Sequence, residues 1–273
     1  MEFYYHHYLI VLSAAFLGLE RLRPWRRRQR VLRRGLLDDL FYLAFNGHFL
    51  GLLLAQATVH TAAWFATATD QVGLYRMIHA GVASGWPIWL QVLVAFVGLD
   101  FVQWSVHNAL HRVPWLWEFH KVHHSIEELD WIGNFRFHWV EVIVYKAAQY
   151  LPLILLGFDG GVLLAFAVVQ TASGFFNHAN LDVDIGPLKY VLNNPRMHVW
   201  HHDRDEIAPP GVNFAILFSA WDWIFGTAWL PDDDRQPRRL GFDGLEEFPR
   251  RVPGQVVHPV PLPRRKRRPS GAA

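Results

Sequence analysis

The chain has 273 residues, of which 52% are hydrophobic and only 18% are charged, against roughly 25% charged residues in an ordinary soluble domain. It contains no cysteine, which excludes disulfide scaffolds, thiolate zinc sites, cysteine-ligated iron–sulfur clusters and cysteine nucleophiles. The formal net charge of +2 conceals two basic runs, residues 21–34 and 264–268. Because the first run directly follows an apolar segment, we interpret them as cytoplasmic flanks of a membrane protein rather than as a nucleic-acid surface.

The first apolar segment, about residues 3–19, is long enough to cross most of a bilayer of roughly 30 Å. Glu2 precedes this segment and the arginine run follows it, which is opposite to the charge order of a cleaved signal peptide, so we expect a retained helix with its N-terminus outside. A second segment, about residues 40–65, carries polar side chains that predict either a face turned towards protein or a broken, re-entrant helix. These polar residues are Asn46, His48, Gln56 and His60.

A third apolar segment, about residues 87–106, begins with a proline, whose missing N–H costs nothing at a helix start. Two further segments, about 140–156 and 161–176, are separated by a Gly-Phe-Asp-Gly sequence and predict a helical hairpin with a glycine turn. A hairpin returns the chain to the side of the membrane from which it started. The sequences before and after the hairpin therefore lie on the same side, whether the hairpin crosses the membrane or only dips into it. With the first basic run inside, the positive-inside rule places this side and the C-terminus in the cytoplasm.

Together these segments predict an all-α fold, an integral membrane helical bundle of about four or five apolar segments with a cytosolic helical cap. We divide the chain into N-terminal membrane helices (1–99), a catalytic region (100–230) that includes the membrane hairpin (140–176), and a tail (231–273). The tail contains eight of the 16 prolines, which is typical of an extended or disordered segment.

Histidine is concentrated in the region that we assign to the cap. Ten of the 16 histidines lie between residues 107 and 202, and eight of these form three boxes with spacings of three and four residues. Residues at these spacings share a helix face, so each box is expected to point two or three imidazoles at one point, as bonding to a metal ion requires. The boxes are His107 and His111; His120, His123 and His124; and His198, His201 and His202.

Clustered imidazoles near a membrane are costly unless a metal organises them, because charged rings repel one another and neutral rings need a partner for every nitrogen. Eight imidazoles exceed the capacity of one ion, so we expect a dimetal site with four or five nitrogens on each ion and a position left for oxygen or a bridging hydroxide. The His-Glu-x-x-His motif of a zinc hydrolase does not occur in the sequence. Imidazole suits iron, zinc and copper alike, and redox chemistry favours iron.

Further motifs surround the boxes: WLWEFHKVHHS (115–125), NFRFH (134–138), HANL (178–181), NF (213–214) and WDWIFGT (221–227). The boxes and these motifs resemble the sterol desaturase family of the fatty acid hydroxylase superfamily over about residues 100–227, a little under half of the chain. Members of this family are integral membrane enzymes that use a histidine-bound di-iron centre and O2 to hydroxylate or desaturate sterols and other lipids. The motif set is specific to this chemistry and unspecific to the substrate.

The resemblance implies that the eight box histidines are metal ligands, and it adds His178 as a ninth. His138 matches a further motif with Arg136 and Glu141, in which the usual proline is here Trp139, so it is a candidate additional ligand or partner of a ligand. A ligating imidazole normally donates its other N–H to a carboxylate, a carbonyl or water. The further candidates for such contacts are Glu141, Asp100, Asp203, Asn213 and Asp222.

Two local patterns complete the cap region. Asn194 followed by Pro195 predicts the start of the helix that carries the third box, with Asn194 as its N-cap. Tryptophans recur through the same region and form either an interfacial belt or the lining of a lipid channel. They are Trp104, Trp115, Trp117, Trp131, Trp139, Trp200, Trp221, Trp223 and Trp229.

The resemblance therefore implies a membrane-bound, O2-dependent oxidoreductase with two Fe ions that hydroxylates or desaturates a C–H bond of a sterol, fatty acyl or isoprenoid-like lipid. The sequence contains no dinucleotide fingerprint, no P-loop and no cysteine cluster, so we expect electrons from a separate donor such as a ferredoxin, cytochrome or reductase. Two alternatives stay open, a zinc-dependent membrane lipid hydrolase and a non-enzymatic membrane protein that binds metal or haem. We expect a protein of the bacterial inner membrane, with the active site facing the cytoplasm and no nucleic-acid partner.

Overall fold

The structure is a computed structural model that describes residues 4–70, 82–205, 207–233 and 235–260. Within these residues the regular structure is entirely helical, which confirms the predicted all-α class. In chain order the elements are α1 (Tyr5–Leu22), α2 (Leu36–Tyr42), the π-helix η1 (Leu43–Leu50), α3 (Gly51–Asp70), α5 (Ile88–Arg112), α6 (Pro114–His124), η2 (Trp131–Phe135), α7 (Trp139–Leu155), α8 (Gly160–His178), η3 (Gly186–Tyr190), α9 (Pro195–His201), α10 (Ala220–Phe225), η4 (Leu245–Glu247) and α11 (Val252–Val257).

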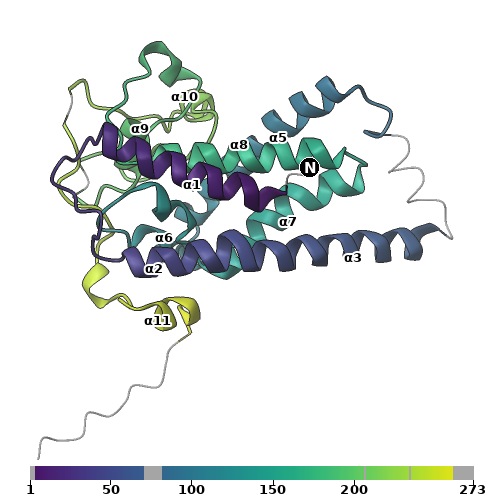
Figure 1. Cartoon of the computed structure of the whole chain (residues 1–273), viewed down its shortest axis with the longest axis horizontal. Coiled ribbons are helices and arrows are strands. Elements are labelled where there is room, and N and C mark those ends of the chain that lie inside the picture. Colours follow the sequence, from purple (N-terminus) through teal and green to yellow (C-terminus); the bar gives the residue numbers. More distant parts are fainter. Residues whose placement is uncertain (1–3, 71–81, 206, 234, 261–273) are drawn as a thin grey trace, which may run out of the picture.

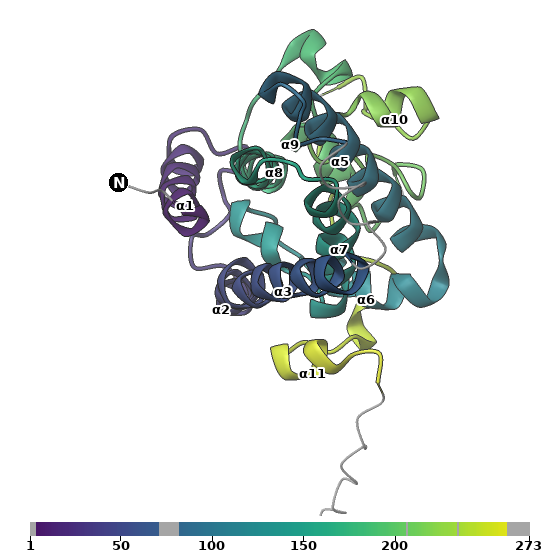
Figure 2. The ribbon, with the colours of Figure 1, turned by 90° about the vertical axis from the view of Figure 1, so that its right-hand side faces the viewer.

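The long helices run side by side, and most of the short ones gather at one end of the molecule (Figure 1). α8 packs against α1 and α5, and α7 packs against α3 and α5. Seen along the bundle, α1 and α5 lie on opposite sides of α8 (Figure 2). Three stretches are long and apolar enough to cross a membrane: Leu36–Thr69, Ile88–Arg112 and Gly160–His178. The chain thus combines membrane helices with a cap of short helices, as predicted.

The second apolar segment forms one helical stretch in which α2, η1 and α3 follow each other directly. Asn46 in η1 is buried and faces the protein, because its side-chain amide donates to the main-chain carbonyls of Phe135 and Phe137 at 2.9 and 2.8 Å. The prediction of a protein-facing side was right for Asn46. It was wrong for the other three polar residues, which are exposed: His48, Gln56 and His60.

α5 extends six residues beyond the predicted segment, so that it carries the first histidine box on its last turns. The predicted hairpin consists of α7 and α8. Gly157 after α7 has a φ of 77°, a left-handed conformation that favours glycine. Asp159 caps α8, because its carboxylate accepts hydrogen bonds from the N–H groups of Gly161 and Val162.

The C-terminal segment packs onto the cap, and the expectation that it is extended or disordered was wrong for residues 240–258. Phe242 and Phe248 are buried in a cluster with Tyr42 of α2 and Val122 of α6. These two aromatic side chains anchor the proline-rich segment, because each aromatic ring removes a large apolar area from water. The second basic run, residues 264–268, lies outside the described residues.

Candidate metal centre

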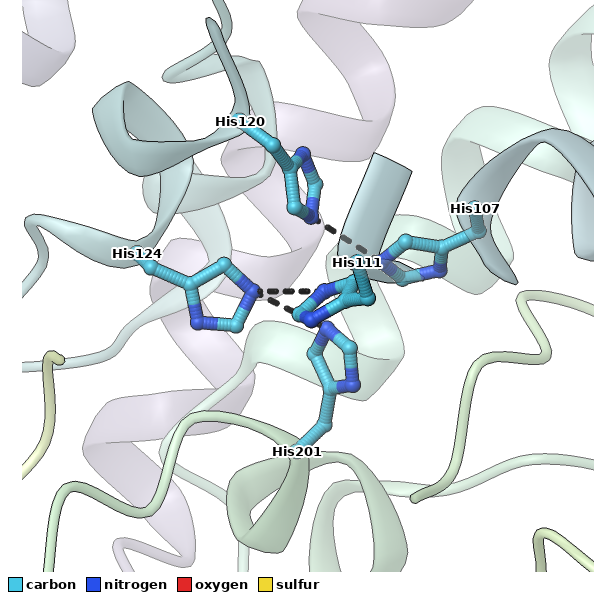
Figure 3. Close-up of side chains that lie close together, drawn as sticks. All are labelled: His107, His111, His120, His124 and His201. Carbon is cyan, nitrogen blue, oxygen red and sulfur yellow. Dashed lines mark hydrogen bonds between the residues drawn. The ribbon is translucent and has the colours of Figure 1, made fainter. Parts of the chain in front are cut away.

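The nine predicted ligands lie in two neighbouring groups within the cap. In each group the candidate ligand atoms all lie within 4.8 Å of one another. The five-histidine group contains His107, His111, His120, His124 and His201, and the four-histidine group contains His123, His178, His198 and His202. Figure 3 shows the rings of the five-histidine group pointing towards one another from α5, α6 and α9. All nine residues are buried except His111, which is partly buried.

The second and third boxes are each divided between the two groups. In each of these two boxes, the two histidines that are four residues apart belong to one group, and the histidine between them belongs to the other. Thus His120 and His124 are separated from His123, and His198 and His202 are separated from His201. The prediction that each box points at one place was right for the first box and wrong for these two. The reason is that a helix turns about 100° per residue, so positions i and i+4 differ by about 40° while i+3 and i+4 differ by about 100°.

The rings meet through their Nε2 atoms. Every close contact between imidazoles within the groups joins two Nε2 atoms at 3.1–3.3 Å. The pairs are His107–His120, His111–His124, His124–His201, His123–His178, His178–His198 and His198–His202. The Nε2 atoms therefore face the centre of each group.

Main-chain carbonyls fix the orientation of several rings from outside. The Nδ1 atoms of His107, His123 and His201 lie 2.7, 3.1 and 2.8 Å from the carbonyl oxygens of residues 214, 136 and 212 respectively. A carbonyl oxygen can only accept a hydrogen bond, so each of these Nδ1 atoms carries a hydrogen. The Nε2 atom of such a ring, when the ring is neutral, then presents a lone pair to its group.

His178, the last residue of α8, is oriented in the same way by its own helix. Its Nδ1 lies 2.8 Å from the carbonyl oxygen of Gly174, one turn earlier. A Cβ atom at position 174 would collide with the side-chain amide of Asn134, so glycine allows the close approach of α8 and η2. This close approach is what lets α8 deliver His178 to the four-histidine group.

Six histidines of the two groups lie outside the candidate membrane spans, and their pKa values are lowered. Burial lowers the pKa of each of them well below the usual value, and neighbouring imidazoles lower most of them further; they are His120, His123, His124, His198, His201 and His202. A neutral ring keeps the lone pair that a metal ion needs.

The contact between His123 and His178 tests whether a cation fits the four-histidine group. Both rings donate from Nδ1 to a carbonyl, so two Nε2 lone pairs face each other at 3.2 Å with no proton to share. A cation between them converts this repulsion into two ligand bonds. Nitrogens bound at about 2.1 Å and at right angles on one metal ion lie about 3 Å apart. The donor set and its spacing are therefore compatible with a metal site.

Glu141 contacts a predicted ligand directly. Its Oε1 atom lies 2.8 Å from Nδ1 of His120, and both side chains are fully buried. Its Oε2 atom is also buried and has no hydrogen-bond partner. A carboxylate behind an imidazole fixes the ring and raises its basicity as a ligand.

Asp222 acts on the five-histidine group through the main chain. Its carboxylate accepts hydrogen bonds from the N–H groups of Phe214 and Ala215 at 3.0 and 2.9 Å, and from the indole of Trp104 at 3.0 Å. Asp222 is completely buried. It thereby holds Phe214, whose carbonyl oxygen receives the hydrogen bond of His107.

Asn213 lies between the two carbonyls that orient His107 and His201. It adopts a left-handed conformation with a φ of 55°, and its side-chain amide donates to the carbonyls of Met197 and Trp229 at 2.8 and 2.7 Å. Asparagine tolerates this conformation better than most residues. Asn213 therefore shapes the backbone that presents both acceptors.

The other predicted partners lie further from the histidines. Asp100 accepts hydrogen bonds from residues 217, 218 and 221, and so fastens α5 to α10 and to the segment before it. His138 caps α7 and donates to the carbonyl of Val256 at 2.9 Å. Asp203 accepts from the N–H groups of residues 205, 207 and 208 in a local turn. The structure does not bring these three residues to either histidine group.

A buried ion-pair network beside the four-histidine group was missed by the sequence reasoning. Arg136 donates to Asp39 at 2.5 Å, and Arg33 donates to Asp39 and Asp130 at 2.6 and 2.5 Å. The main-chain carbonyl of Arg136 is the acceptor for His123, so the network holds that acceptor in place. Arg33 belongs to the basic run that we interpreted as a membrane flank, and this was wrong for Arg33, which is only 6% exposed. The available signal was Asp39, an acidic residue at the edge of an apolar segment.

Comparisons with known proteins agree with the motifs. Residues 92–227 match the family model described as fatty acid hydroxylase. Ornithine lipid hydroxylase OlsE of Rhizobium tropici is 34% identical over 146 residues, which cover 54% of this chain and 44% of that protein. Alkylglycerol monooxygenase of Xenopus tropicalis is 28% identical over 161 residues, covering 59% and 34%. Very-long-chain aldehyde decarbonylase GL1-5 of Oryza sativa subsp. indica is 25% identical over 256 residues, covering 86% and 37%.

The chain spans less than half the length of each of these relatives. No solved structure matches it significantly. The matched region contains all nine histidines of the two groups and the residues 212–222 that orient two of them. The chain therefore belongs to the fatty acid hydroxylase superfamily, with residues 92–227 as its fatty acid hydroxylase domain.

Proposed function

We propose that the protein is a membrane-bound, O2-dependent oxidoreductase that hydroxylates or desaturates a C–H bond of a lipid, with one iron in each histidine group. The observation that carries this proposal is the pair of buried histidine groups whose Nε2 atoms face inward, in a chain of the fatty acid hydroxylase superfamily. Two similar proteins are named as a lipid hydroxylase and a monooxygenase, which supports oxidation of a lipid over its hydrolysis.

In this proposal the nine histidines are the metal ligands, and iron bound by them supplies the activation of O2 and the oxidation of the C–H bond. The protein supplies positioning. Glu141 and main-chain carbonyls hold the Nε2 atoms of five of these histidines towards their groups, so this part of the ligand set is preorganised. The five are His107, His120, His123, His178 and His201.

Aromatic side chains pack around both histidine groups. Phe137 stacks on His123 with a ring distance of 4.4 Å, and Trp117 packs against His111 and His124 at 5.0 and 5.1 Å. Together with the buried rings themselves, these side chains keep water from the reacting centre.

The electrons come from a separate protein in this proposal, a ferredoxin, cytochrome or reductase. We further propose the domain division 1–99, 100–230 and 231–273, and a location in the bacterial inner membrane with the histidine groups and the C-terminus on the cytoplasmic side. The exposed arginines that follow α1 support this orientation by the positive-inside rule.

The test is metal content per chain, measured by mass spectrometry on protein purified in mild detergent from iron-supplemented cells, together with the O2-dependent mass change of membrane lipids under 18O2. Gain of one 18O atom reports hydroxylation, and loss of two hydrogens reports desaturation, in which both oxygen atoms leave as water. We expect about two irons per chain in the parent, and loss of metal and lipid oxidation in His123→Ala with the membrane helices intact. His138→Ala is the matched control, because His138 lies outside both groups. Lipid turnover without O2 and with bound zinc would favour the hydrolase, and a Soret band would favour a haem protein.

A further inference from the structure

An exposed apolar surface covers α10 and the neighbouring η3, on the outside of the cap. Its side chains are between 38% and 66% exposed. Single exposed apolar residues are ordinary, whereas a contiguous patch marks a place where something else makes contact. We call this patch the α10–η3 surface; it consists of Leu188, Tyr190, Val191, Trp223, Ile224 and Phe225.

The two elements of this surface are joined into one unit. The main-chain carbonyl of Lys189 accepts hydrogen bonds from the hydroxyl of Ser219 at 2.7 Å and from the indole of Trp223 at 3.0 Å. The rings of Tyr190 and Trp223 lie 4.8 Å apart. The exposed side chains are thus presented together by a fixed backbone.

The α10–η3 surface is attached to α5 by hydrogen bonds. Asp100, which is completely buried in the middle of α5, accepts hydrogen bonds from the N–H groups of Leu217 and Phe218 and from the indole of Trp221. Figure 2 shows α10 beside α5, on the side away from α8. The position of α10 relative to the membrane is therefore determined by the position of α5.

The depth of α10 follows from the length of α5. Phe225 stacks on Trp104 with ring centroids 4.7 Å apart, and Trp221 packs on Phe101 at 5.0 Å. At 1.5 Å per residue, Phe101 and Trp104 lie about 20 and about 24 Å from Ile88, the first residue of α5. The hydrocarbon core is roughly 30 Å thick, so a spanning α5 brings α10 to its inner edge.

The outer face of α5 is continuous with the α10–η3 surface. From Ile88 to Phe101 that face exposes apolar side chains, and the only charged residue in this stretch is Asp100, which is buried. Trp89 at the other end of α5 is 67% exposed. Exposed tryptophan and tyrosine residues near both ends of a spanning helix are typical of the two membrane interfaces. The exposed residues of α5 concerned are Ile88, Trp89, Leu93, Val94, Val97 and Phe101.

We propose that the α10–η3 surface is inserted into the lipid bilayer beside α5, at the boundary between acyl chains and head groups. This inference goes beyond the proposed function, because it concerns how the cap meets the membrane and holds whichever metal or substrate the protein uses. Insertion attaches the cap to the membrane through α10. This helix also carries Asp222, which holds Phe214, and the carbonyl oxygen of Phe214 is the hydrogen-bond acceptor of His107. The five-histidine group then lies next to the inner leaflet.

The absence of cysteine makes the surface directly testable by labelling. Single cysteines at Ile224 and Leu188, which are 66% and 57% exposed, are labelled with the fluorophore NBD in protein reconstituted into vesicles of phosphatidylcholine and phosphatidylglycerol. Quenching is measured with nitroxide-bearing lipids and with aqueous iodide. Leu93→Cys on α5 is the membrane reference. Asp233→Cys, at an exposed position of the C-terminal segment, is the aqueous reference.

We expect both labels to be quenched by the lipid-borne nitroxides to a similar extent as the label at Leu93, and several-fold less by iodide than the label at Asp233. Quenching by iodide as strong as at Asp233 would overturn the proposal. Protection from both quenchers would overturn it as well, because the surface would then be covered by protein, such as a second copy of the chain. Metal per chain is measured in the same samples, so a failure of the metal proposal is seen separately.

Discussion

Replacing Glu141 should weaken one metal site and leave the other unchanged. Glu141 contacts Nδ1 of His120 at 2.8 Å, and both side chains are fully buried. Removing the partner of a ligating imidazole typically reduces metal affinity 10–100-fold, which corresponds to about 1.4–2.7 kcal/mol. We expect Glu141→Gln to reduce metal affinity by about 10-fold, because glutamine keeps an acceptor for the Nδ1–H of His120 and loses only the charge. Glu141→Ala should reduce metal affinity by about 100-fold, because it leaves this N–H buried without a partner.

The assay is metal content after equilibration at graded concentrations of free ferrous ion. The parent should fill both groups over one concentration range, whereas Glu141→Ala should bind one equivalent in that range and the second only at 10–100-fold higher concentration. Val144→Ala is the control on the same helix, because Val144 is 42% exposed and belongs to neither group.

Double variants identify which group is weakened. Adding His201→Ala to Glu141→Ala changes a residue of the same group, so little metal beyond that already lost should disappear. Adding His198→Ala changes the four-histidine group, so both equivalents should be affected. If Glu141→Ala weakened both equivalents equally, or neither, the division into two sites with separate supports would be refuted.

Three further predictions follow from the contacts around the groups. Gly174→Ala should lower the thermal denaturation midpoint and the metal content, because its Cβ would collide with Asn134; unchanged values would contradict the close packing of α8 on η2. Asp39→Asn should cost about 3–5 kcal/mol, because it removes the carboxylate that pairs with the buried guanidinium of Arg136. Asp38→Asn, at the half-buried neighbouring position, should cost far less, and denaturant titration compares the two variants. Removing metal with a chelator should lower the midpoint reversibly, since a ligand at 100 times its Kd stabilises by about 2.7 kcal/mol per site; no change would argue against metal binding.

Much of the local structure could be predicted because it depends on neighbouring residues. Asn194 caps α9 by accepting from the N–H of Met197 at 3.2 Å, and Pro195 is the first residue of that helix, as their order in the sequence predicted. The glycine turn that the sequence predicted between α7 and α8 is present, with Gly157 in the left-handed conformation. Such features need only a few adjacent residues, so the pattern of residue types is sufficient to find them.

Other expectations failed where a distant segment decides the environment. Arg33 has the same side chain as its exposed neighbours in the basic run, but it is buried because Asp39 and Asp130 meet it there. Tryptophan shows the same divergence: Trp200 is buried in the cap core, whereas Trp223 is exposed on α10. Neither outcome is visible in the residue type or in its immediate neighbours.

The sequence by itself determined the long apolar helices, the histidine boxes and the chemistry that imidazole allows, because helical spacing and side-chain type are local properties. Only the tertiary structure decided how the nine histidines divide into groups of five and four, and which main-chain carbonyls orient them. The physical reason is that the division depends on the relative rotation of α5, α6, α8 and α9, which is set by packing between distant segments. A carbonyl acceptor, moreover, is present at every residue, so nothing in the sequence distinguishes those at positions 136, 212 and 214.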